Sequence, residues 1–398
     1  MAWAILSGWI ISNCCIEALM RSNAAYLTAV FLLLFIMTAG AQEPDTAYLA
    51  RVQDTVDRYY RLHPRKRIPR DYRNFEVTPL FGVMYTQETG VVAMGGFMGG
   101  YRTSADTLLP MSSVGVAALV STNLSLAGAV TGVRYAPAGK FVIEYTARVN
   151  SSPRYFWGLG YDCAADDSNR GSFTSRRVRV RADFLYRGDI LKTGGFAGYD
   201  YYHALDFSDP SVVSGHPVLT QYLTAGARLD LDTRDNASVP SRGLFLNIEP
   251  SVSIPLTEAL PFFRTKVTLD MYFGLWSGGV LAVDLYGDLS TDGAPWTMWP
   301  ESGGDVRMRG YYQGRYRDRN LLSAQVELRQ TVYRSHGVAV WAGAGNVFPA
   351  FGRLRIKNTL PTYGAGYRFT FLGLVLRLDA GFGLRGQWAV TAGVSHSF

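Results

Sequence analysis

The sequence has little cysteine and little histidine, and each scarcity excludes a class of site. Only three cysteines occur, and two of them, Cys14 and Cys15, lie in the opening segment. The remaining Cys163 has no partner there for an intrachain disulfide or a cysteine metal site. The five histidines are scattered, without the close spacing of a metal site. We therefore expect no metal and no other cofactor.

Long apolar runs are also lacking beyond the opening segment. No later run reaches the roughly 18 consecutive apolar residues that a membrane-spanning helix needs. Charged residues make up only 18% of the chain, whereas aromatic residues make up 13% and glycine occurs 42 times. A soluble all-β protein is compatible with these figures. A barrel that is apolar outside and polar inside fits them at least as well.

The sequence offers little support for nucleic-acid binding or for catalysis. The net charge of +7 could suit nucleic acid, but the arginines fall mostly at alternate strand positions or in loops. No basic face with interleaved aromatics emerges, so we expect no nucleic-acid partner. A membrane-embedded hydrolase would need a nucleophile beside a base. His203, His216 or His336 could supply the base, but no serine stands out and no G-x-S-x-G elbow occurs. We predict that the protein is not an enzyme.

The first residues are typical of a secretory signal. Residues 24–37 are apolar, Arg21 precedes them, and residues 39–41 (Ala-Gly-Ala) form a cleavage site. At about 14 residues the run is short for a helix that must cross roughly 30 Å of hydrocarbon. We predict a signal segment over 1–41, with the natural start at Met20 and cleavage after Ala41. A short polar periplasmic lead over 42–74 follows it.

From Thr89 onward, apolar and polar residues alternate with a period of two. Such stretches include 177–186, 223–232, 264–273, 322–329, 374–380 and 388–398. This period places the two sets on opposite faces of a sheet. A soluble sandwich alternates as well, but here charges sit in mid-strand while the other face stays apolar, over about fifteen or sixteen segments. Hydrocarbon requires every backbone group to be paired, so the sheet must close on itself. We predict an all-β, transmembrane antiparallel β-barrel of about 16 strands over 75–398.

Three motifs carry a family resemblance. They are residues 75–79 with 88–90, residues 232–235 with 240–244, and the glycine- and arginine-rich run 303–327. In these motifs the chain resembles the bacterial surface-antigen barrel of the BamA/TamA outer-membrane assembly-factor superfamily, over roughly residues 75–398. Members that insert or secrete proteins usually carry periplasmic POTRA repeats, and residues 42–74 are too few for one.

The resemblance implies that the loop carrying Arg309, Gly310 and Tyr311 folds back into the lumen. A confined guanidinium needs a carboxylate that matches its fork, and Glu327 projects inward from the next strand. Gly310 would allow a tight turn, and Tyr311 would pack on the inner wall. The alternative is a solvated loop tip. The family tends to place a further aspartate where Gly343 aligns, so we expect that Arg309 has lost one acidic partner.

Further residues are expected in two groups. The first group lines the same loop, with a solvated extracellular tip as the open alternative: Arg307, Arg315, Arg317, Asp318 and Arg319. The second group is the C-terminal strand, in which Trp388 and Phe398 resemble the signal that assembly machinery reads on outer-membrane clients. The simpler interpretation of Phe398 is an aromatic residue at the membrane interface.

The resemblance implies a role in outer-membrane biogenesis, as a protein inserting or translocating other proteins or as a partner subunit. The expected partners are the lipid bilayer of the bacterial outer membrane, the assembly machinery and a protein client. The alternative is a porin-like channel for small anionic solutes. A weak seam between first and last strands would favour insertion, whereas a continuously paired seam around an open lumen would favour a pore.

Overall fold

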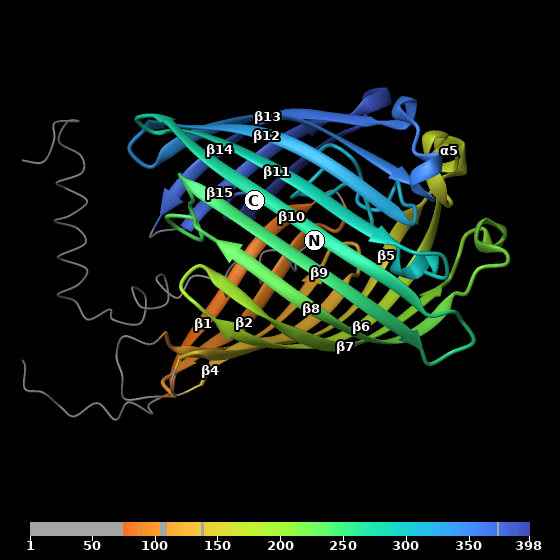
Figure 1. Cartoon of the computed structure of the whole chain (residues 1–398). Coiled ribbons are helices and arrows are strands. Elements are labelled where there is room, and N and C mark those ends of the chain that lie inside the picture. Colours follow the sequence, from red (N-terminus) through yellow and green to blue (C-terminus); the bar gives the residue numbers. More distant parts are fainter. Residues whose placement is uncertain (1–74, 87, 104–109, 137–138, 372–373) are drawn as a thin grey trace, which may run out of the picture.

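In the computed structural model, the chain forms one 16-stranded sheet that curls into a barrel (Figure 1). The structure describes residues 75–398 except 87, 104–109, 137–138 and 372–373. The predicted signal over 1–41 and the predicted lead over 42–74 lie outside these residues. Each strand pairs antiparallel with the next one along the chain. No helix in the described ranges is long and apolar enough to span a membrane.

The sixteen strands follow one another in a simple meander. In chain order they are β1 (Glu76–Thr86), β2 (Gly90–Tyr101), β3 (Ser112–Ser121), β4 (Leu126–Tyr135), β5 (Phe141–Phe156), β6 (Gly171–Arg187), β7 (Leu191–Leu205), β8 (Leu219–Asp232), β9 (Gly243–Pro255), β10 (Phe262–Trp276), β11 (Gly279–Ser290), β12 (Asn320–Tyr333), β13 (His336–Phe348), β14 (Leu360–Phe371), β15 (Leu374–Phe382) and β16 (Trp388–Val394). The short helices lie in the loops: α5 (Gly160–Ala165), η1 (Asp167–Asn169), η2 (Pro210–Val213), η3 (Trp296–Met298), η4 (Phe351–Arg353), η5 (Ile356–Asn358) and η6 (Leu384–Gly386).

The alternation in the sequence matches the two faces of the barrel wall. In β12, Val326 is 43% exposed, whereas its neighbours Gln325 and Glu327 are 3% and 0% exposed. Val326 therefore faces outward and the two polar residues face the interior. The same arrangement repeats on β6, where Val180 and Phe184 are exposed and Asp183 is buried. The predicted antiparallel barrel, apolar outside and polar inside, is confirmed.

The two ends of the barrel differ in the length of their connections. At one end the connections are short, such as the two-residue turn between β10 and β11, where Gly278 has a φ of 73°. The opposite end carries the long loops, including the one with α5 (Figure 1). The longest runs over residues 291–319, between β11 and β12. A loop of this length can reach back into the barrel.

The last strand ends earlier than predicted. The alternation suggested one strand over 388–398, but β16 ends at Val394. Ser395 has a φ of 77°, a left-handed conformation that an extended strand cannot contain. The chain then turns inward, so that Ser397 is 5% exposed while Trp388 faces outward and is 59% exposed. The prediction that Trp388 and Phe398 share one continuous strand is therefore wrong.

The barrel has a seam without a backbone ladder. β16 lies beside β1, but the continuous order of paired strands begins at β1 and ends at β16. Among the described residues, no paired register joins these two strands. The expectation that the sheet closes by pairing is therefore wrong at this one junction, which leaves two strand edges facing each other.

The membrane-facing surface gives the first testable prediction. Val180→Arg would place a charge on the lipid face at the middle of β6, and we expect it to destabilise the folded barrel by about 2–4 kcal/mol. Tyr186→Arg, near the end of the same strand, should cost about 0–1 kcal/mol. Unfolding titrations in phospholipid vesicles measure both variants. Equal losses at the two depths would contradict a membrane-spanning outer face.

Candidate functional site

The loop between β11 and β12 is folded into the barrel. Its most buried side chains are no more than 2% exposed: Trp296, Ser302, Met308, Arg309, Tyr311, Tyr316 and Arg317. Gly303, Gly304 and Gly310 have φ values of 96°, 115° and 109°, which glycine adopts at little steric cost. These glycines allow the long loop to reverse direction inside a confined space.

Gly310 lies at the closest approach of this loop to the wall. A Cβ atom at Gly310 would lie 2.7 Å from the backbone nitrogen of Phe382 and 2.8 Å from the carbonyl carbon of Gly381. A Cβ atom at Gly381 would in turn lie 2.7 Å from the carbonyl carbon of Arg309. Thr362 donates a hydrogen bond from its hydroxyl to the Arg309 carbonyl oxygen. The loop tip and β15 therefore touch backbone to backbone.

Arg309 is held between two carboxylates and an aromatic ring. Its Nη2 lies 2.6 Å from Glu327 Oε2, and its Nη1 lies 2.9 Å from Asp379 Oδ2. Its guanidinium carbon is 3.6 Å from the ring centroid of Trp341. Arg309, Glu327 and Asp379 are each no more than 1% exposed. Two charge-assisted contacts and a stacked ring offset much of the cost of removing this cation from water.

The second acidic partner comes from a strand that the sequence did not indicate. Asp379 lies on β15, whereas the expected aspartate position, Gly343, lies on β13 opposite Gln325 and Thr362. A Cβ atom at Gly343 would lie 2.7 Å from the Ala324 carbonyl oxygen. The wall is therefore crowded at Gly343, and the carboxylate is supplied two strands further on.

Three further arginines surround these carboxylates. Arg329 Nε lies 2.8 Å from Glu327, Arg368 pairs with Asp379, and Arg377 Nη2 lies 2.8 Å from Asp305 in the loop. All three are 4–5% exposed. The buried network thus ties the loop to β12, β14 and β15.

The C-terminal residues complete this network. Ser397 donates a hydrogen bond of 3.1 Å from its hydroxyl to Glu327 Oε2. Arg329 donates one of 2.8 Å to the Phe398 carbonyl oxygen and lies 5.1 Å from the ring of Phe398. The inward turn at Ser395 therefore brings Phe398 to the lumenal network, on the opposite side of the wall from the outward-facing Trp388.

Tyr311 and Arg307 hold the loop at two more points. The Tyr311 hydroxyl donates to the Pro361 carbonyl at 2.6 Å and accepts from the Leu384 backbone N–H at 2.8 Å. Arg307 contacts the fully buried Asp284 through Nε and Nη2, at 2.9 and 2.6 Å. Tyr311, an anchor predicted from the resemblance, thus reaches β14 and the segment after β15. Arg307, which was predicted to line the loop, reaches β11.

The remaining loop residues lie nearer the mouth of the barrel. Arg315 lies 3.0 Å from Asp167, in the loop that carries η1. The Asp318 carboxylate accepts the Arg319 backbone N–H at 2.7 Å. Arg319 itself pairs with Asp292, which is 93% exposed. Arg315 and Arg319 are therefore not brought to the anchor around Arg309.

Arg317 belongs to a separate ion pair under the mouth. Its Nη2 lies 3.3 Å from Glu301, which also holds Arg154 of β5 at 2.7 Å. Arg317 is 5.5 Å from the ring of Trp296. Burial alone would raise the pKa of Glu301, but the facing guanidinium groups outweigh it and hold that pKa well below its usual range. Glu301 and Arg154 were not identified from the sequence.

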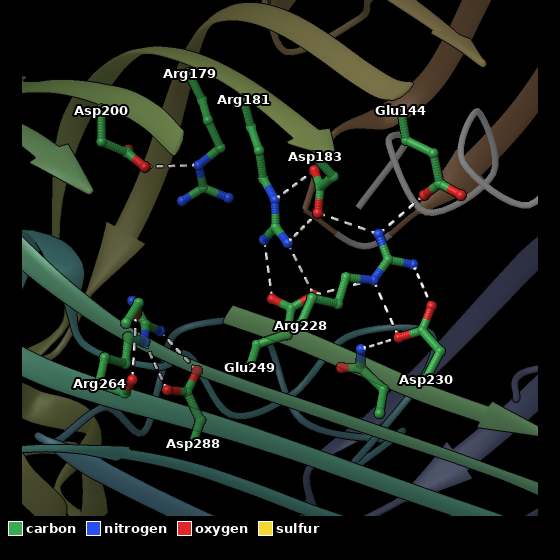
Figure 2. A network of polar contacts seen from close by, with 12 residues as sticks. Glu144, Arg179, Arg181, Asp183, Asp200, Arg228, Asp230, Glu249, Arg264 and Asp288 are labelled. Carbon is green, nitrogen blue, oxygen red and sulfur yellow. Dashed lines mark hydrogen bonds and ion pairs between the residues drawn. The ribbon is translucent and has the colours of Figure 1, made fainter. Parts of the chain in front are cut away.

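A second lumenal network lies along β5 to β10 (Figure 2). Arg228 of β8 lies 2.9 Å from Glu144 of β5 and 3.2 Å from Asp183 of β6. Arg181 of β6 lies 2.9 Å from Glu249 of β9. These contacts cross the curved wall rather than joining ladder neighbours. The alternating charges in the sequence place these side chains inside, but the curvature decides which of them meet. In the part of the chain that the structure describes, no group of three or more His, Cys, Asp or Glu side chains is placed to hold a metal ion.

Known structures share this barrel, although no protein-family model and no curated protein sequence matches the chain. BamA from Haemophilus ducreyi lacking POTRA domains 1–3 is similar with a TM-score of 0.60 and 12% identity, over 81% of this chain and 70% of that one. CdiB from Acinetobacter baumannii is similar with a TM-score of 0.52 and 13% identity, over 81% and 59%. CdiB from Escherichia coli is similar with a TM-score of 0.53 and 14% identity, over 80% and 62%.

These similarities confirm the BamA-type barrel as the fold. The chain spans about three fifths of the length of either CdiB. At such low identities the likeness concerns architecture alone. An apolar outer face around a polar interior, in a barrel of this fold, is the architecture of a bacterial outer-membrane protein.

The buried anchor gives a second prediction. We expect Arg309→Ala to destabilise the barrel by about 3–5 kcal/mol, because Glu327 and Asp379 would lose their shared cation. The stability of Arg309→Lys should lie between those of Arg309→Ala and wild type. An ammonium group keeps the charge but lacks the fork that reaches both carboxylates. Denaturant unfolding in detergent micelles, followed by tryptophan fluorescence, measures the difference.

Arg319→Ala is the matched control for this experiment. It also removes one arginine from the loop, but the partner of Arg319 is exposed, so the expected loss is about 0–1 kcal/mol. If Arg309→Ala cost no more than Arg319→Ala, the anchor would not hold the loop in the barrel.

Proposed function

We propose that this barrel inserts or translocates other proteins at the bacterial outer membrane, through the seam between β1 and β16. One observation carries the proposal: in the described chain, these two strands lie side by side without a paired register. A strand edge presents unpaired N–H and C=O groups that can pair with another chain. An incoming strand can therefore add to β1 by backbone hydrogen bonding.

The lengths of the two strands support this role. β16 has 7 residues and β1 has 11, so even full pairing would leave part of the β1 edge free. Beyond Val394 the chain turns into the lumen instead of continuing along β1. Unpaired backbone groups are costly in hydrocarbon, which favours occupation of this edge by a further strand.

The position of the inward loop also supports the proposal. Its anchors lie on β11, β12, β14 and β15 through Asp284, Glu327, Pro361 and Asp379. These contacts attach the loop to the strands that precede β16. Opening at the seam would break the contacts of the C-terminal residues and strain the hydrogen bond from the Gln313 backbone N–H to Glu88, in the turn after β1. It would leave these four anchors intact.

Sealing the seam tests the proposal. Val394 packs against the apolar cluster that contains Met84 of β1. In a Cys163→Ser background, Met84→Cys with Val394→Cys should be joined by a bifunctional thiol reagent. We expect the crosslinked protein to lose client insertion, measured as the level of outer-membrane proteins in cells depleted of the wild type.

Ala365→Cys with Ala380→Cys is the control pair. These residues are ladder partners on β14 and β15, so linking them closes nothing that was open. Activity should survive this crosslink. If the barrel sealed between β1 and β16 also kept full activity, the proposed route through the seam would be wrong.

A channel for small anionic solutes is the second candidate, and an excess of cations on the inner wall at β6 and β10 favours it. The inward loop opposes it, because the loop occupies the lumen. In planar bilayers we expect wild type to give low or flickering conductance, and Arg309→Ala to give larger, longer openings as the loop is released. A large, steady conductance in wild type would instead favour the channel.

A further inference from the structure

The strongest unassigned feature of the lumen is a cluster of cations on β6 and β10. We name Arg177, Arg179, Arg264 and Lys266 the basic patch. All four project from the inner face, below the loop that carries η3. We propose that the basic patch binds a phosphate group inside the barrel, an inference that goes beyond the proposed role in protein insertion.

The members of the basic patch converge although three strands separate β6 from β10. Arg177 Nη2 lies 3.8 Å from Met298 Sδ, and Arg264 Nη1 donates a hydrogen bond of 2.9 Å to the Met298 carbonyl oxygen. Two guanidinium groups thus reach one residue of the loop. Arg179 follows Arg177 by two residues on β6, and Lys266 follows Arg264 by two on β10, so each faces the lumen beside its strand partner.

Too few carboxylates balance these four cations. Arg177 and Arg179 share Asp200, each at 2.7 Å. Arg264 holds Asp288 through Nε and Nη2, at 2.7 and 2.6 Å. Asp200 and Asp288 therefore form the ion pairs of three arginines. Two carboxylates face four cations, so the basic patch has a net charge of about +2.

Arg179 presents the free end of its guanidinium group to the lumen. Only its Nε contacts Asp200, and its terminal nitrogens have no partner among the residues of the described chain. Figure 2 shows these nitrogens pointing into the space opposite Arg264 and Asp288. The Arg179 side chain is 36% exposed although it lies inside the barrel, so a small ligand or water can reach it.

Lys266 is the second uncommitted cation. Its ladder neighbours are Glu249 on β9 and Asp288 on β11. Glu249 is held by Arg181 and Asp288 by Arg264. Within the described ranges, the Lys266 amine makes no hydrogen bond and no ion pair. A lysine placed between two acids, both already occupied by arginine, has an unused charge and three unused donors.

The imbalance is local to this part of the wall. Nearer the turn end of the same wall, the neighbouring network joins Glu144, Asp183, Asp230 and Glu249 to Arg181, Arg228 and Lys192, so that acids outnumber bases. The interior is therefore not uniformly basic. Positive charge gathers where the wall passes below the loop.

A phosphate group matches the two uncommitted cations. The paired terminal N–H groups of Arg179 suit two oxygens of a phosphate, and the compact ammonium group of Lys266 suits a third. The phosphate can belong to a free phosphorylated solute or to a lipid headgroup that enters from the seam. Both sources offer the same oxygens to the patch.

Binding of inorganic phosphate to the purified barrel tests the site. Isothermal titration calorimetry in nanodiscs of phosphatidylcholine would use wild type and Arg179→Gln/Lys266→Gln. We expect saturable binding in wild type and at least a tenfold weaker affinity in the double variant. Retained heat-modifiable gel mobility would show that this variant is folded.

The control is Lys192→Gln/Arg319→Gln, which removes two charges outside the basic patch. We expect its affinity to stay within twofold of wild type. Equal weakening in both double variants would mean attraction by overall charge and would overturn the site. Absence of saturable binding in wild type would overturn it as well.

A second arm identifies the source of the phosphate. Nanodiscs that contain phosphatidylglycerol should weaken the binding of free phosphate to wild type if a lipid headgroup enters the patch. Unchanged binding would assign the patch to soluble phosphorylated ligands. Both outcomes support the phosphate site. The client-insertion assay of the crosslinked seam tests the proposed function separately, so failure of one proposal can be told from failure of the other.

Discussion

The two salt bridges that Arg309 forms with Glu327 and Asp379 are the interaction on which the rest of the interior depends. A guanidinium group withdrawn from water is tolerated only where carboxylates match its fork. Here they come from β12 and β15, which are not neighbours in the sheet. The two salt bridges can therefore form together only if the wall is curved and the loop lies inside. Loop position and wall curvature are fixed together by one buried cation.

The contacts between loop and wall are distributed unequally around the barrel. The wall from β11 to β15 is bound to the loop by ion pairs, hydrogen bonds and the backbone contact at Gly310. The junction of β16 with β1 is held by the packing of Val394 against the cluster that contains Met84, but it lacks a ladder. Separation costs least where the fewest contacts are lost, and this is the physical reason for proposing the seam as the route into the membrane.

The interior also divides by charge. Near the turns, the network around Arg228 satisfies its cations with an excess of acids, whereas below the loop Arg179 and Lys266 have charge to spare (Figure 2). In a lumen that excludes part of the water, such separation favours anions on one level of the barrel. The proposed phosphate site on β6 and β10 is at least five strands away from the seam between β1 and β16 in the sheet.

The sequence by itself determined the alternation, and through it the barrel, its apolar outer face and the set of inward-facing charges, because side chains on a strand alternate strictly between its two faces. It also indicated Glu327 as a partner for Arg309, through the resemblance. Tertiary structure alone decided that Asp379 rather than position 343 supplies the second carboxylate, that the chain turns inward at Ser395, and that β1 and β16 meet without pairing. Strand period is a local property, whereas contacts across a lumen depend on curvature and on the register accumulated over sixteen strands.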